Sequence, residues 1–221
     1  MPHEERIAGL RALGSLRPGC AATCLALALA VTGGAERELL REKAALLDPH
    51  YANDVLRRIG ALWARHHDLD LATVVGLHRQ LAAAEELSER MGPAWVALGL
   101  MYADFGRTAE AIACDARSRR CGDEGHPDLA LEIGRLEMAA GHTEAALPWL
   151  ERAAVDDETR VAAWLHLSVC ASRRGALEEA RNWARAASGT APAWPEPVSW
   201  LQALAGKPGY DEASSAGSSS G

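Results

Sequence analysis

A period of about 34 residues constrains this chain more than any other feature of its sequence. Three kinds of landmark keep one register through three consecutive cycles. A period of this length is typical of stacked helix pairs, in which each pair buries its apolar face against the next. The landmarks are a small residue (Gly99, Gly134, Ser168), a glycine (Gly106, Gly141, Gly175) and an alanine (Ala111, Ala146, Ala180).

Each landmark has a steric reason within a helix–turn–helix unit. The small residue suits a point where two helices cross, because a longer side chain would hold them apart. The glycine suits the turn, since a positive φ ends a helix at little cost there. The alanine allows the second helix to approach the first. Acids such as Glu110 and Glu144 follow the turn, where they favour a helix N-terminus.

The segment 92–194 resembles the tetratricopeptide repeat (TPR) family, with copies at about 92–126, 127–160 and 161–194. The resemblance implies an all-α fold, a right-handed α-solenoid of antiparallel helix pairs, and a role in binding other proteins. The first copy carries the opening motif Trp95, Leu98, Gly99 and Tyr102.

Two residues depart from the family pattern. Asp115 stands where the first copy usually has an aromatic residue, and Glu137 takes the tyrosine position of the second copy.

The remainder of the chain is expected to extend the same stack. Residues 1–91 are predicted to form N-terminal helices in degenerate repeats, 92–194 three regular repeats, 195–205 a capping helix and 206–221 a disordered tail. Gly60 is expected to occupy a helix-crossing position. The helices predicted before the regular repeats are 3–16, 20–31, 35–47, 51–66 and 71–91.

The apolar run from Cys20 to Val31 has two interpretations. It could be the core of a secretory signal, but Glu4 and Glu5 oppose the positive charge that such a signal needs at its start. The run is also too short to cross a bilayer. We therefore predict a buried helix and no membrane insertion.

Composition narrows the class of partner. The net charge is −7, which argues against nucleic acid and against an anionic membrane surface. Only Lys43 and Lys207 are lysines among 23 basic residues, a bias typical of a GC-rich bacterial genome. The five cysteines lack CxxC spacing and are interpreted as small buried hydrophobes in a reducing cytoplasm.

No motif for catalysis, phosphate binding or metal binding is present. His66, His67 and Asp68 are interpreted as polar residues of a turn, although an acid–base or metal cluster is the alternative. The sequence thus predicts no enzyme, no metal site and no cofactor.

In the TPR family the first helix of each repeat lines the concave face, so the resemblance implies a mostly apolar groove with an arginine near its middle. The family's carboxylate clamp for acidic chaperone tails is not expected, because Glu132 and His166 are among the residues at its positions. The groove either binds a helix or extended peptide of another protein or is filled by the chain's own N-terminal helices. Its predicted residues are Val96, Leu100, Leu131, Arg135, Met138, Leu165 and Val169.

These features favour a non-catalytic cytoplasmic adaptor or chaperone-like protein. The alternatives are a scaffold that self-assembles as a homo-oligomer and, third, an accessory subunit of an enzyme.

Overall fold

The computed structural model describes residue 8 and residues 21–88 and 90–206. Within these residues the chain is all-helical and contains no β-strand, as the sequence predicts. Its contacts divide it into two compact units, Met1–Glu124 and Gly125–Gly221, so the division falls after the first regular repeat. The predicted helix at 3–16 and nearly all of the predicted tail lie outside the described residues.

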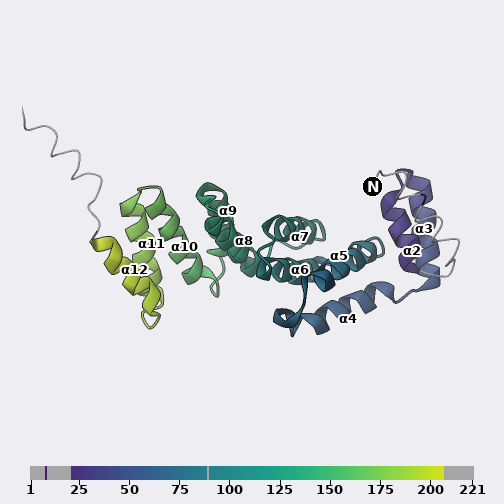
Figure 1. Ribbon diagram of the computed structural model, residues 1–221, viewed down its shortest axis with the longest axis horizontal. Coiled ribbons are helices and arrows are strands. Elements are labelled where there is room, and N and C mark those ends of the chain that lie inside the picture. Colours follow the sequence, from purple (N-terminus) through teal and green to yellow (C-terminus); the bar gives the residue numbers. More distant parts are fainter. Residues whose placement is uncertain (1–7, 9–20, 89, 207–221) are drawn as a thin grey trace, which may run out of the picture. The chain divides into compact units, whose positions relative to one another are not determined.

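In the described residues of the first unit the helices form three pairs, each made of helices adjacent in the sequence (Figure 1). Two of the pairs, α2 with α3 and α4 with α5, precede the regular repeat that α6 and α7 form. The helices are α2 (Ala21–Ala30), α3 (Gly34–Leu47), α4 (Tyr51–Trp63), the short 3-10 turn η1 (His66–Asp68), α5 (Leu71–Glu85), α6 (Gly92–Asp104) and α7 (Thr108–Arg120).

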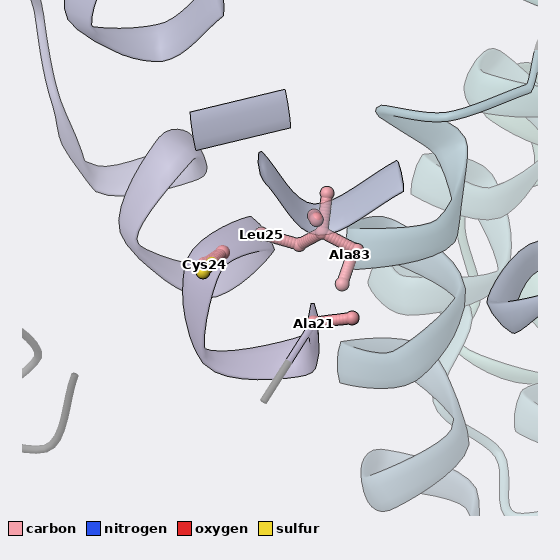
Figure 2. Packing of buried hydrophobic residues seen from close by; sticks show 5 residues of the cluster. Ala21, Cys24, Leu25 and Ala83 are labelled. Atoms are coloured by element: carbon pink, nitrogen blue, oxygen red, sulfur yellow. The ribbon is translucent and has the colours of Figure 1, made fainter. Parts of the chain in front are cut away.

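The apolar run near the N-terminus forms a buried helix, which confirms that interpretation of the sequence. Ala21, Cys24 and Leu25 of α2 lie in one cluster with Ala83 of α5 (Figure 2). Ala44 of α3 belongs to the same cluster and is fully buried. This run is therefore part of the packed core of the first unit.

Two expectations for the first unit are wrong. The helix predicted to reach Met91 ends at Glu85, and the Arg41 Nε donates a hydrogen bond to the carbonyl oxygen of Glu86 just beyond it (2.6 Å). Gly60 does not lie at a helix crossing: it is exposed, and a Cβ added there would meet no atom within 4 Å. Its neighbours leave open space where Gly134 has a close contact with Leu150.

The second unit contains two regular repeats and a final helix. The helix bounds follow the predicted copies closely, and the last helix covers the predicted cap. The helices are α8 (Pro127–Ala139), α9 (Thr143–Ala153), α10 (Arg160–Arg173), α11 (Leu177–Thr190) and α12 (Pro195–Ala205).

The three turn glycines and Gly134 have the geometry that their spacing predicts. Gly106, Gly141 and Gly175 have φ values of 66°, 85° and 81°, which L-residues with a side chain rarely adopt. Gly134 lies at a tight crossing, since a Cβ there would be 2.7 Å from the Leu150 Cδ2. Glycine is therefore needed for different reasons at the turns and at the crossing.

At the third crossing a serine joins three helices. The Ser168 hydroxyl of α10 donates a hydrogen bond to the Ala180 carbonyl oxygen of α11 (2.5 Å). Its oxygen accepts one from the Trp200 Nε1 of α12 (2.8 Å). The capping helix is thus held by a directed bond as well as by apolar packing around Leu204.

Arginine side chains bind carbonyl groups at the C-terminal ends of several helices. A helix leaves its last carbonyls without backbone partners, and a cation there also complements the helix dipole. The many arginines therefore stabilise helix ends in addition to reflecting a genomic bias. The residues are Arg37 at the end of α2, Arg41 just after α5, Arg173 at α8, Arg160 just after α9 and Arg181 at α12.

No helix within the described residues is both long and apolar enough to cross a membrane.

Candidate functional site

The predicted groove residues of the second unit lie on α8 and α10. Leu131, Leu165 and Val169 are each half-buried, so each keeps accessible area in the isolated chain. Leu131 and Val169 also pack against the buried cluster that contains Leu150 and Leu167. These side chains therefore contribute both to the core and to the surface of the unit.

Arg135 of α8 is the charged residue among the predicted groove residues. Its side chain is 52% exposed, and its Nη1 lies 2.7 Å from the Glu132 Oε1 one turn earlier. On α10, burial and, to a smaller extent, the positive charge of Arg135 together lower the pKa of His166 to about 4. His166 is therefore neutral at neutral pH, and Arg135 of α8 lies close enough to influence it electrostatically.

Two predicted groove residues are buried. Met138 is 6% exposed and packs in the same cluster as Leu150, while Val96 of α6, in the first unit, is 5% exposed. Each offers a partner almost no area. Leu100, one turn after Val96 on α6, is half-buried and remains the accessible predicted residue of that helix.

The departures from the family pattern are satisfied inside the protein. Asp115 is fully buried and pairs with the Arg119 Nη2 at 2.9 Å. Glu137 pairs with the His142 Nδ1 at 2.8 Å. Asp115 thus has a charged partner one turn away on its own helix, and Glu137 has a partner across a short loop.

Three of the five cysteines are buried, as predicted, whereas Cys121 is not fully buried and Cys20 lies outside the described residues. Cys24, Cys114 and Cys170 are buried free thiols, and Cys121 is half-buried. Burial raises the pKa of Cys114 to about 12, which keeps it a neutral thiol. None of these observations supports a nucleophilic cysteine.

The turn histidines have a neighbour that the sequence did not indicate. The ligand-type atoms of His66, His67 and Asp104 all lie within 4.8 Å of one another, the one such group found among the described residues. Asp104 is the last residue of α6 and lies far from the histidines in the sequence. Spacing alone pointed to Asp68, so sequence analysis missed this acid.

Comparison with known proteins identifies the architecture. No protein-family profile matches this chain, and no curated protein does. A structure described as "Functional Characterization of Pseudomonas aeruginosa PilF" matches with a TM-score of 0.53 and 17% identity, covering 91% of this chain and 90% of that one. It is a TPR-type helical repeat protein. This chain has a TPR-like fold.

A second TPR-type structure supports the same conclusion. It is the APC/C hetero-tetramer Cut9–Hcn1, which matches with a TM-score of 0.50 and 12% identity. The match covers 91% of this chain but 46% of that one, so the chain spans less than half of its length. Identities this low support the TPR-like fold and leave function to be argued from the residues.

Proposed function

We propose that this protein is a non-catalytic protein–protein interaction module, an adaptor or chaperone-like protein that binds an apolar or amphipathic segment of a partner. The observation that carries the proposal is the accessible apolar area of Leu131, Leu165 and Val169 on α8 and α10. Apolar surface gathered on the helices that line the groove in this family is typical of a protein interface. An acidic chain with free, buried thiols is consistent with a bacterial cytoplasmic setting.

Recognition would follow the helix-in-groove mode. A partner helix places anchors at i, i+3 or i+4, and i+7 against an apolar stripe. Leu165 and Val169 are one turn apart on α10 and face the same side of that helix. Arg135, which is already exposed, could exchange its ion pair with Glu132 for one with an acidic residue beside the partner's apolar anchors.

A self-assembling scaffold is the second candidate. Leu39 and Leu46 of α3 are 65% and 85% exposed, which is a large apolar exposure for one helix of a monomer. A second copy of the chain could cover such residues. The third candidate, an accessory subunit of an enzyme, would use the same α8 and α10 residues.

Affinity capture with matched variants distinguishes these functions. Leu165→Glu places a charge among the apolar contacts of α10, whereas Val155→Glu changes an apolar residue that is already 76% exposed outside the helices. We expect a heterologous partner to be retained by the wild type and by Val155→Glu and lost by Leu165→Glu, as identified by mass spectrometry. Recovery of the chain alone would support the self-assembling scaffold. Equal capture of the partner by both variants would refute a binding surface on α8 and α10.

A further inference from the structure

Two histidines of η1 and an aspartate of α6 form a compact group in the first unit. The His66 Nε2 lies 3.4 Å from the Asp104 Oδ2, and the His67 Nδ1 lies 3.5 Å from the same oxygen. A charge-assisted hydrogen bond to a carboxylate is about 2.7–2.9 Å long. Both nitrogens therefore lie near the same oxygen, but farther from it than in a strong hydrogen bond.

These separations match those between ligands of a metal ion. Zinc binds histidine nitrogen and carboxylate oxygen at about 2.0–2.2 Å, so neighbouring ligand atoms of a tetrahedral ion lie roughly 3.3–3.5 Å apart. The two measured nitrogen–oxygen distances agree with this spacing. The two nitrogens lie within 4.8 Å of each other, and the exposed His67 side chain can close the remaining difference.

The surroundings of His66 prepare it as a ligand. Its Nδ1 lies 2.7 Å from the Trp63 carbonyl oxygen, which can only accept, so the Nδ1 carries the proton. The Nε2 is then left with a free lone pair toward Asp104. The imidazole also stacks on the Trp63 ring, with centroids 4.1 Å apart and planes 11° apart. A ligand histidine is usually oriented by such a backbone acceptor on its other nitrogen.

We propose that His66, His67 and Asp104 bind a divalent transition-metal ion, with Zn²⁺ best suited to this set. Two imidazoles and one carboxylate supply three ligands and leave a fourth position for water. The C-terminal end of α6, where Asp104 lies, also favours a cation. The bound ion joins η1 to α6, and so ties the α4–α5 pair to the first regular repeat.

The test uses the full chain freed of metal by a chelator. Titration calorimetry with ZnCl₂ should detect one site with a Kd on the order of 10 μM or tighter. Asp104→Asn keeps the shape of the side chain and removes its charge, and His66→Gln removes the oriented nitrogen. We expect each variant to weaken binding by at least about tenfold, the lower end of the effects of changing the surroundings of a metal ligand. His50→Gln, in the same unit and outside the group, should bind as the wild type does.

A second measurement tests the role of the site as a link. Zn²⁺ at about 100 times its Kd should raise the Tm of the wild type by roughly 5–10 °C, and that of Asp104→Asn much less. MgCl₂, whose ion prefers oxygen ligands, should have no such effect. A Kd weaker than about 1 mM would show that the group is only a histidine–aspartate contact and would overturn the proposal. Zn²⁺ binding unchanged in both variants would place the metal elsewhere and would overturn it equally.

Discussion

Replacing Gly134 with alanine should destabilise the protein, although alanine is the better helix former. The added Cβ would lie 2.7 Å from the Leu150 Cδ2 and 2.8 Å from its Cγ, whereas carbon atoms normally pack at about 3.5–4.0 Å. Leu150 is fully buried in a cluster with Met138 and Leu167, so it must move by nearly 1 Å within a packed core. Overpacking costs about 1–3 kcal/mol, and the helix propensity of alanine offsets up to about 1 kcal/mol of that. With that full offset, the net expectation is a loss of up to about 2 kcal/mol.

Gly60→Ala is the matched control, because Gly60 is also a helical glycine and its Cβ would meet no atom within 4 Å. It should raise the free energy of unfolding by about 0.5–1 kcal/mol. Urea denaturation of the full chain, followed by circular dichroism, measures both changes. If Gly134→Ala stabilised the protein as much as Gly60→Ala, the tight crossing of α8 and α9 would be refuted.

Two further predictions concern the second unit. Burial lowers the pKa of His166 from 6.5 to about 4, so its contribution to stability is fully present above about pH 6.5 and is lost as the pH falls toward 4. Between pH 7 and pH 5 the wild type should therefore lose about 1–2 kcal/mol more than His166→Gln in urea denaturation, and equal losses would contradict the burial of a neutral imidazole. Ser168→Ala removes the hydroxyl that bonds the Ala180 carbonyl and the Trp200 indole, and should lower the free energy of unfolding by about 1–3 kcal/mol. Ser199→Ala, at an exposed hydroxyl on α12, is the control and should cost well under 1 kcal/mol. Similar costs for the two variants in thermal denaturation would refute the bridging role of Ser168.

The regular repeats could be predicted because each landmark has a local cause. A turn glycine needs a positive φ, and Gly106, Gly141 and Gly175 all have one. The crossing at Gly134 follows from the same register. The right-handed twist that the family resemblance implies stays a prediction.

The degenerate part was harder to predict because its register has no such local cause. Gly60 matches the crossing position by count, yet the structure leaves it exposed. Just after the end of α5, the carbonyl oxygen of Glu86 accepts a hydrogen bond from Arg41 of α3, a residue far away in the sequence. No spacing within residues 71–91 encodes that contact.

The candidate sites show the same distinction. The repeat register predicted Leu131, Leu165 and Val169 as groove residues, and all three keep accessible area. It could not show that Met138 and Val96 are buried, because burial depends on which neighbouring helix covers them. Asp104 was missed for a similar reason, since only the fold brings it to His66 and His67.

The most direct test of the proposed function compares binding and stability in Leu131→Glu. The new carboxylate would enter an apolar contact, and the affinity for the captured partner, measured by calorimetry, should fall at least about 30-fold. A fully exposed groove residue would contribute almost nothing to the free energy of unfolding. Leu131 also packs against buried clusters of the second unit, so we expect its replacement to lower the free energy of unfolding by about 1 kcal/mol. Weaker binding by a variant that remains folded is the result that the account predicts. A large loss of stability with unchanged affinity per folded molecule would show that the α8 and α10 stripe is internal packing, and would contradict it.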